Sequence, residues 1–108
     1  MAGDGAVVCL VTTPPDQADE IAAALVGERL AACVNVVPGV RSVYRWEGEV
    51  ARDDEALLIV KTTAATLPAL EDALRRIHPY DNFELVALDA AGGAPAYLEW
   101  IAASVDGG

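Results

Sequence analysis

Several side-chain chemistries are scarce in this sequence of 108 residues. Aromatic residues make up 6%, and there are two cysteines and one histidine. Two cysteines cannot build a disulfide framework, and both lie inside apolar runs, at 7–11 and 31–34, which favours buried free thiols in a reducing compartment. We see no signal peptide and no apolar run near the roughly 20 residues of a membrane span. The sequence therefore predicts a cytoplasmic protein without a membrane partner.

Basic residues are also few. Seven lysines and arginines stand against 17 aspartates and glutamates, which gives a formal net charge of −10. Such a surface repels phosphate backbones and anionic lipid headgroups, so no nucleic-acid partner is expected. Cations are the favoured small partners, although a charge that merely aids solubility explains the same composition.

Apolar residues, in contrast, are plentiful enough for a core. They make up 54% of the chain, and because aromatics are rare, valine, leucine, isoleucine and alanine must form that core. The length fits a single domain over residues 1–108, with flexible ends expected at 1–5 and 105–108.

The spacing of apolar and turn residues predicts an alternation of strands and helices. Strands are expected at 6–13, 33–46, 50–62 and 83–88, and helices at 16–30, 66–78 and 97–104. Pro38 and Gly39 predict a bulge in the second strand, Asp53 and Asp54 another in the third, and residues 47–49 a hairpin turn. With right-handed crossovers, this order predicts the α+β class: a ferredoxin-like β-α-β-β-α-β sandwich with a C-terminal helix.

Two of the predicted strands are apolar on both faces. Residues 7–11 and 56–60 do not alternate with polar side chains, as a sheet covered on one face requires. The two main helices cover one face, and a bare second face would expose a larger apolar patch than soluble monomers show. We therefore expect a homo-oligomer in which the long hairpin around 40–52 reaches a neighbouring subunit.

A few residues are candidates for ligand binding, although no motif for phosphate binding, for a nucleophilic serine or for a zinc protease is present and no enzyme is expected. His78, just after a helix, is either a ligand or a helix-end hydrogen-bonding group. Tyr44 and Trp46 on the hairpin form either a pocket wall or interface packing. Lys61 and Glu84, at strand ends, either pair with each other or belong to a small-molecule or metal pocket.

Six short segments stand out when they are taken together. In chain order they are Val11-Thr12-Thr13-Pro14-Pro15-Asp16, Glu28-Arg29-Leu30-Ala31-Ala32-Cys33-Val34-Asn35, Tyr44-Arg45-Trp46-Glu47-Gly48, Ile59-Val60-Lys61-Thr62, His78-Pro79-Tyr80 and Tyr97-Leu98 with Trp100. The series resembles the CutA divalent-cation tolerance family over about residues 7–104. The resemblance implies a ferredoxin-like subunit, a tightly packed homotrimer similar to PII-type signalling trimers, a cytoplasmic location and a part in tolerance of copper and other divalent ions. It implies no catalytic activity.

The resemblance also implies a copper site, which this sequence matches in part. The family's proposed site uses a cysteine near the end of the first strand and two adjacent histidines before Pro-Tyr. Thr12 stands at the cysteine position, Ile77 at the first histidine and His78 at the second. Cys9 lies three residues before Thr12, so alternation points it to the other face. His78 is thus the expected metal ligand, with weak binding of Cu or Zn unless carboxylates or neighbouring subunits complete the site.

The leading hypothesis is a trimeric, non-enzymatic protein of divalent-metal tolerance or response that binds a metal ion or small ligand in clefts between subunits. The residues expected to line the cleft are Tyr44, Trp46, Lys61, Tyr80 and Glu84, with His78 on the metal. The alternative is a PII-like signalling or scaffold trimer that docks a partner protein or a metabolite. The lack of a basic phosphate-binding loop counts against a nucleotide as that metabolite.

Native mass measurement at micromolar concentration is expected to give an oligomer, with three times the mass of one chain if the family resemblance holds. The physical reason is the second apolar face of the sheet, which needs a cover. One chain weighs 11.2 kDa. A protein that stays at this mass would contradict the argument from the two-faced sheet.

Overall fold

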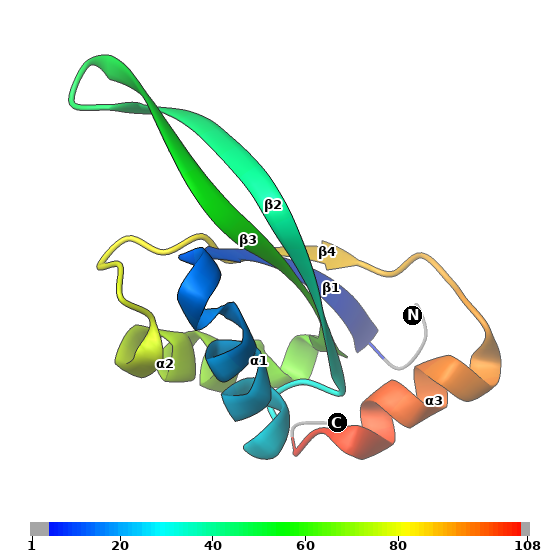
Figure 1. Ribbon diagram of the computed structural model, residues 1–108. Coiled ribbons are helices and arrows are strands. Elements are labelled where there is room, and N and C mark those ends of the chain that lie inside the picture. Colours follow the sequence, from blue (N-terminus) through cyan, green and yellow to red (C-terminus); the bar gives the residue numbers. More distant parts are fainter. Residues whose placement is uncertain (1–4, 107–108) are drawn as a thin grey trace.

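Figure 1 shows the computed structural model, which describes residues 5–106. A four-stranded sheet carries two helices on one face, and a third helix lies beside one end of the sheet. In chain order the elements are β1 (Ala6–Thr13), the 3-10 turn η2 (Pro15–Gln17), α1 (Ala18–Gly27), β2 (Cys33–Trp46), β3 (Glu49–Thr63), the 3-10 turn η3 (Ala64–Thr66), α2 (Leu67–Ile77), β4 (Val86–Asp89) and α3 (Pro95–Ser104). In this described part of the chain, every helix is too short or too polar to cross a membrane.

The strands follow the order β2-β3-β1-β4, and every neighbouring pair is antiparallel. β1 is an inner strand, so that Cys9 lies opposite Val60 of β3 and Ala87 of β4. α1 connects β1 to β2 and α2 connects β3 to β4, and each helix crosses over one strand. This is the ferredoxin-like β-α-β-β-α-β sandwich predicted from the order of the elements.

Alternate residues of the sheet form the main core with the inner faces of α1 and α2. Cys9, Leu58 and Val60 are completely buried there, which confirms that Cys9 points away from the face of Thr12. Each of the two main helices buries a stripe of apolar residues. The buried residues are Ala18, Ile21, Ala22 and Leu25 in α1, and Leu70, Ala73 and Leu74 in α2.

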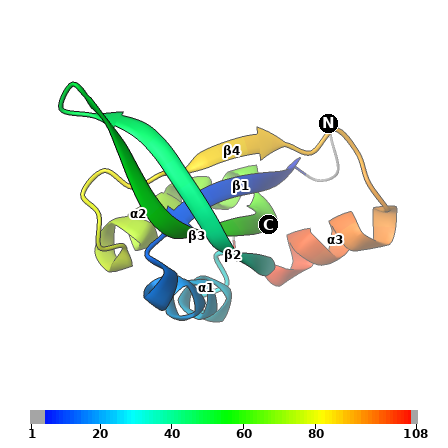
Figure 2. The same cartoon turned by 45° about the horizontal axis from the view of Figure 1, so that its top comes forward.

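The other face of the sheet is apolar as well, and α1 and α2 do not cover it. Leu10 and Ile59 lie opposite each other on this face and are half-buried. On the edge strand β4, Val86 is 49% exposed and Leu88 50% exposed. Figure 2 shows α1 and α2 on one side of the sheet and α3 beside its end. The predicted pair of apolar faces is therefore present, and one of them is open.

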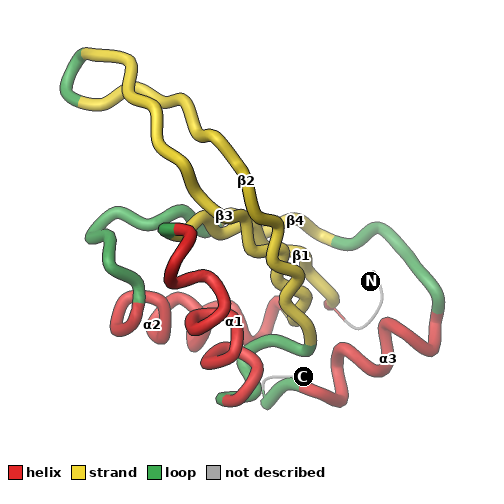
Figure 3. Tube along the Cα trace, viewed as in Figure 1, coloured by secondary structure: helices red, strands yellow, loops and turns green. Residues whose placement is uncertain are grey.

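β2 and β3 continue beyond the sheet as a two-stranded arm (Figure 3). The pairing in this hairpin arm runs from Val40 with Glu55 to Trp46 with Glu49. The tip consists of a two-residue turn whose residues, at 47 and 48, have φ angles of 51° and 83°. Two positive φ angles are typical of the type I′ turn, whose twist matches that of a hairpin. The predicted hairpin is confirmed, with its turn at residues 47 and 48.

The register of β2 against β3 shifts between Val37 and Val40. Gly39 takes a φ of 74° inside this interval, a left-handed conformation that glycine adopts without strain. The bulge predicted at Pro38 and Gly39 is therefore confirmed. It increases the local twist at the point where the arm leaves the sheet.

The second bulge, predicted at Asp53 and Asp54, is wrong. Both residues pair in regular register, Asp53 with Ser42 and Asp54 with Arg41. They tolerate a regular strand because this part of β3 belongs to the arm, where both aspartates are exposed and remain solvated.

The first helix is shorter than predicted, because it ends at Gly27 and not at residue 30. Arg29 takes a left-handed conformation with φ of 60°. The backbone N–H of Leu30 then bonds back to the carbonyl of Leu25, a bond that closes the end of a helix and turns the chain away. The sequence did not predict this helix end, because Arg29, and not a glycine, occupies the left-handed position that follows the helix.

The last strand is also shorter than predicted, since it begins at Val86 and not at residue 83. Phe83 and Leu85 instead pack their side chains against the main core. The second main helix agrees with the prediction to within one residue at each end. The packing of Phe83 and Leu85 against the core thus decided that β4 begins at Val86.

The residues after α3 are more ordered than expected. Val105 is buried, and the backbone N–H of Asp106 donates to the carbonyl of Arg29 at 3.1 Å. These two residues are thus held by packing and by a hydrogen bond, and the flexibility expected from residue 105 onward stays a prediction. The predictions for 1–4 and 107–108 lie outside the described residues.

Gly39→Ala is expected to lower the free energy of unfolding by about 1–2 kcal/mol, because an L side chain disfavours left-handed backbone. No atom lies within 4 Å of the position that its Cβ would take, so the effect would come from the backbone alone. Gly27→Ala, at the end of α1 and in equally open surroundings, is the control and is expected to raise that free energy by roughly 0.5–1 kcal/mol. Denaturant titration measures both changes. Equal stability of Gly39→Ala and the wild type would show that the bulge does not depend on glycine.

Candidate functional site

Three of the predicted site residues lie near the base of the hairpin arm, and a fourth lies further along the arm, nearer to its tip. The loop after α2 passes the base of the arm beside the end of β1 (Figure 1). This loop carries His78, Tyr80 and Glu84, while β2 contributes Tyr44. Glu55, on β3, lies among them and links the loop to the sheet.

The imidazole of His78 uses both of its ring nitrogens for hydrogen bonds within the chain. Nε2 lies 2.8 Å from the carbonyl oxygen of Thr12, and Nδ1 accepts the backbone N–H of Tyr80 at 3.1 Å. Because a carbonyl oxygen only accepts, Nε2 carries the proton of the neutral ring. The ring is buried and stacks on Phe83, with their centroids 5.5 Å apart. His78 therefore braces the loop against the end of β1.

Two tyrosines donate hydrogen bonds to carboxylates on β3. The hydroxyl of Tyr80 donates to Oε2 of Glu55 at 3.2 Å, and the hydroxyl of Tyr44 donates to Asp53. Burial and the charge of Glu55 raise the pKa of Tyr80 to about 12. The bond to Asp53 raises the pKa of Tyr44. Both phenols therefore remain neutral donors at physiological pH.

Glu55 and Glu84 bring two negative charges together. Glu55 is 6% exposed, although it lies where the arm begins. Burial raises the pKa of Glu84, the charge of Glu55 raises it further, and a hydrogen bond with the Thr12 side chain opposes the shift. A cation placed between the two carboxylates would remove this repulsion.

Lys61 and Trp46 lie away from this cluster. Lys61 donates a hydrogen bond to the side-chain oxygen of Asn35. Lys61 pairs with Val8 in the sheet, whereas Leu57 pairs with Thr12, the residue that His78 contacts. Lys61 and Leu57 are four residues apart on β3, a distance of about 13 Å along the strand. The predicted pairing of Lys61 with Glu84 is wrong, because none of the ion pairs among residues 5–106 contains Lys61. Trp46 is 57% exposed beside the turn at the tip of the arm.

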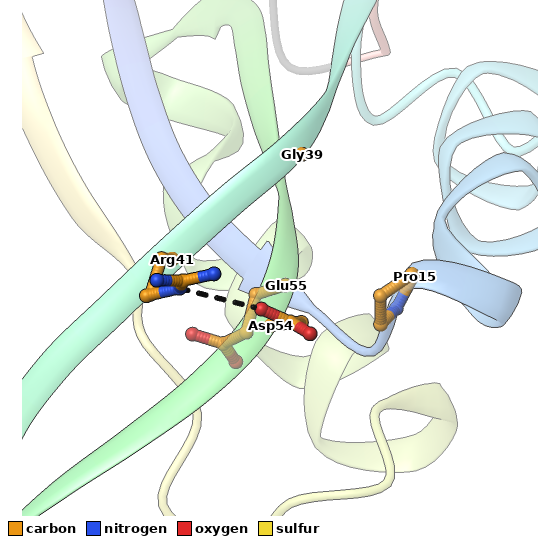
Figure 4. Close-up of a pocket in the computed structure, with 5 residues that line it drawn as sticks. All are labelled: Pro15, Gly39, Arg41, Asp54 and Glu55. Carbon is orange, nitrogen blue, oxygen red and sulfur yellow. Dashed lines mark ion pairs between the residues drawn. The ribbon is translucent and has the colours of Figure 1, made fainter.

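An open hollow lies between the arm and the turn that follows β1 (Figure 4). It has a volume of about 480 Å³ and is lined by Pro15, Gly39, Arg41, Asp54 and Glu55. Nε of Arg41 lies 3.7 Å from Oδ1 of Asp54, and both side chains are well exposed. A solvated ion pair of this kind contributes little to stability.

The sequence prediction did not identify Asp53 and Glu55 as site residues. Asp53 was interpreted as part of a bulge, and Glu55 was not singled out within an acidic stretch of the third strand. The available signal was Glu55 itself, a carboxylate directly before the apolar run that enters the core. A carboxylate that is buried at such a boundary needs a donor, and Tyr80 supplies it.

The residues of one chain do not complete a metal site by themselves. Among residues 5–106, no group of three or more histidine, cysteine, aspartate and glutamate side chains is arranged to hold a metal ion. Cys9 is buried in the core, and this burial raises the pKa of its thiol to about 11, so it remains protonated. Cys33 belongs to the far end of β2.

The fold and the cluster together define a class of protein: a ferredoxin-like subunit with a hairpin arm, an open apolar sheet face, and carboxylates and phenols at the base of the arm. Residues 7–104 match the family described as CutA1 divalent ion tolerance protein. The chain belongs to this family. The resemblance carried by the six sequence segments is thereby confirmed.

Individual relatives agree with the family match. The divalent-cation tolerance protein CutA of Thermus thermophilus is 53% identical over 95 residues, which cover 87% of this chain and 92% of that protein. Protein CutA of Mus musculus is 42% identical over 99 residues, which cover 90% of this chain and 56% of that protein. The chain thus spans nearly all of the bacterial relative and little more than half of the mouse one.

Solved structures show the same fold. The divalent cation tolerance protein of Thermus thermophilus superposes with a TM-score of 0.91 at 50% identity, covering 93% of this chain and 98% of that one. CutA1 of Oryza sativa gives a TM-score of 0.91 at 44% identity and covers 95% of both chains.

Glu84→Gln is expected to flatten the dependence of stability on pH. Because the folded state raises the pKa of Glu84 above its usual value of 4.5, this group contributes stability below about pH 4.5 and loses it as the pH rises through the folded value. The variant should therefore lose less stability than the wild type between pH 4 and pH 7. Denaturant midpoints across this range measure the difference, with the exposed Glu99→Gln on α3 as control. Parallel curves for wild type and Glu84→Gln would contradict the prediction.

Proposed function

We propose that this protein is a trimeric, non-enzymatic CutA protein of divalent-metal tolerance or response, with copper among its ions. It would bind a metal ion or a small ligand in clefts between subunits. The observation that carries the proposal is the open apolar face of the sheet beside a projecting hairpin arm. The family membership supplies the link to divalent ions.

The case for several subunits comes from the open face. Leu10 and Ile59 are half-buried at its centre, and Val86 and Leu88 are about half exposed at its edge. Covering apolar surface contributes about 25 cal/mol for each Å² removed from water, so a second copy of the chain on this face would be strongly favoured. The arm could then pair its strand edges with those of a neighbour. The number three follows from the family resemblance.

The case for a cleft between subunits comes from the incomplete set of ligands in one chain. His78, Tyr80 and Glu84 meet near the arm, but Lys61 and Trp46 do not reach them. A neighbouring subunit could bring its arm, and with it Trp46, to the cluster of another. We therefore propose that the predicted site residues come together only in the assembled oligomer.

The metal would be held by carboxylates with help from His78. The Glu55 and Glu84 carboxylates repel each other, and a divalent ion would neutralise that repulsion. His78 could coordinate only after one ring nitrogen exchanges its present bond, to Thr12 or to Tyr80, for the metal. Oxygen and imidazole donors suit Zn and Cu(II), and the cost of that exchange makes binding weak. Tyr44 and Tyr80 would shape the cleft.

A second candidate is a PII-like signalling or scaffold trimer that docks a partner protein or metabolite. It is favoured by the exposed apolar side chains along the arm, where Val43 is 59%, Trp46 57% and Val50 58% exposed. An aromatic and two branched side chains on a projecting element are typical of a contact surface. Recovery of one partner in fixed stoichiometry from a cell lysate would favour this candidate.

The proposed location is the cytoplasm, where free thiols persist. Cys9 and Cys33 are both free, as a reducing compartment allows. The CutA relatives of rice and of Arabidopsis thaliana are named as chloroplastic proteins.

Calorimetric titration with Cu(II) and with Zn(II) tests the site. His78→Ala is expected to weaken binding by roughly tenfold or more, as the loss of one ligand from a small set does. Glu99→Gln, which removes a carboxylate on α3, serves as the matched control and should titrate like the wild type. Ile59→Asp, which charges the open face, should dissociate the oligomer and abolish binding if the cleft lies between subunits.

Three outcomes would count against the proposal. Identical titrations of wild type and His78→Ala would remove His78 from the site. Full binding by a monomeric Ile59→Asp would place the site within one chain. No heat from either metal at millimolar concentration would favour the scaffold candidate.

A further inference from the structure

The last helix, α3, belongs to a hydrophobic cluster of its own. Over residues 5–106, the main core joins the sheet to α1 and α2 and contains no residue of α3. The second cluster consists of buried Ala6, Ala32, Ile101 and Val105, with Ala90 and Leu98 partly buried around them. Two of its four buried members are alanines, so little apolar area holds it together. Figures 1 and 2 show α3 beside the end of the sheet, outside the layer formed by α1 and α2.

Most of the surface of α3 faces away from the rest of the chain. Ile101 is the one buried residue of this helix. Tyr97 is 44% exposed and Trp100 46% exposed, and their ring centroids lie 5.4 Å apart. The two large aromatic side chains therefore pack on each other and remain nearly half exposed. Regions with few buried apolar contacts open more readily than the core of the same protein.

Arg29 fastens this helix to the rest of the molecule. Its side chain donates from Nε to Oδ1 of Asp106 at 2.7 Å and from Nη2 to the carbonyl of Ala103 at 3.2 Å. Its own carbonyl accepts the backbone N–H of Asp106 at 3.1 Å. One residue thus satisfies a free carbonyl at the end of α3 and pairs with the carboxylate that follows it. The left-handed conformation of Arg29, just after α1, permits this arrangement.

We propose that α3 and residues 105–106 form a strap that detaches from the end of the sheet as a unit while the sheet, α1 and α2 stay folded, and that Arg29 is its latch. The small second cluster and the exposed latch are weaker than the main core, so the strap opens first. The strap gives the subunit a local motion that is separate from global unfolding.

The strap covers the start of β2. Ala32 belongs to the second cluster, and Cys33 follows it directly. Burial raises the pKa of Tyr97 on α3, and Cys33 raises it further. Cys33 pairs in the sheet with Lys61. Opening the strap therefore uncovers the end of the open sheet face that carries Cys33 and Lys61, the end opposite the acidic cluster.

Hydrogen–deuterium exchange of the whole protein without metal tests the latch. Asp106→Ala removes the paired carboxylate, and Arg29→Gly removes the side chain while glycine keeps the left-handed backbone without strain. In both variants the amides of α3 should exchange roughly five- to tenfold faster than in the wild type, the factor expected from losing charge-assisted hydrogen bonds at an exposed site. The amides of α2 and the centre of β3 should not change. Arg41→Ala, which breaks an exposed ion pair with Asp54 on the hairpin arm, is the control and should leave α3 unchanged.

Labelling of the thiols with iodoacetamide gives a second readout. Cys33 should react faster in Asp106→Ala and Arg29→Gly, while Cys9 in the main core should stay unreactive in every variant. Unchanged exchange of α3 in both latch variants would overturn the role of Arg29. Exchange of α2 that rises together with that of α3, or labelling of Cys9 at the rate of Cys33, would show that α3 opens only when the whole subunit unfolds. Neither result would affect the metal titrations, which concern the other end of the sheet.

Discussion

The structure depends on burying a sheet that is apolar on both faces. A four-stranded sheet with two crossover helices can cover one face, and α1 and α2 do so. The second face then needs a cover that one chain of this length does not provide. Val86 and Leu88 on the edge strand β4 therefore remain about half exposed. The open apolar face is thus a property of the subunit itself, and it is larger than the patches that soluble monomers usually expose.

A second constraint is the buried carboxylate at the base of the arm. Glu55 is nearly excluded from water, and a carboxylate in that position is costly without a donor. Tyr80 supplies the donor, and His78 holds the backbone of Tyr80 while its other nitrogen holds the end of β1. The only imidazole of the chain is therefore structural and a candidate ligand at once. Any metal that takes it must compete with the brace that shapes the loop.

The strap and the cluster lie at opposite ends of the same sheet. The cluster is tied into the main core through His78 and Phe83, whereas α3 is held by a few apolar contacts and by Arg29. Such a division lets one end of the open face stay fixed while the other end opens. Local stability of this kind is set by the number of buried contacts and not by the helical propensity of the segment.

Particular residues show which features of the structure could be predicted from the sequence and which could not. The bulge at Gly39 and the turn near residue 48 were predictable, because glycine marks positions where the backbone takes a positive φ. The end of α1 was not, because Arg29 takes the same conformation with tertiary hydrogen bonds as compensation. Lys61 and Glu84 both lie at strand ends, but strand order and register decide which ends are neighbours.

The sequence by itself determined the fold class, the two apolar faces and the family, since hydrophobic period, turn residues and short segments are local properties of the chain. Tertiary structure decided what the polar side chains do. Glu55 accepts a hydrogen bond from Tyr80, and both ring nitrogens of His78 make hydrogen bonds within the chain. Lys61 donates a hydrogen bond to Asn35. The physical reason is that a hydrogen bond between residues distant in sequence depends on the register of the strands and the path of the loops, which no local pattern encodes.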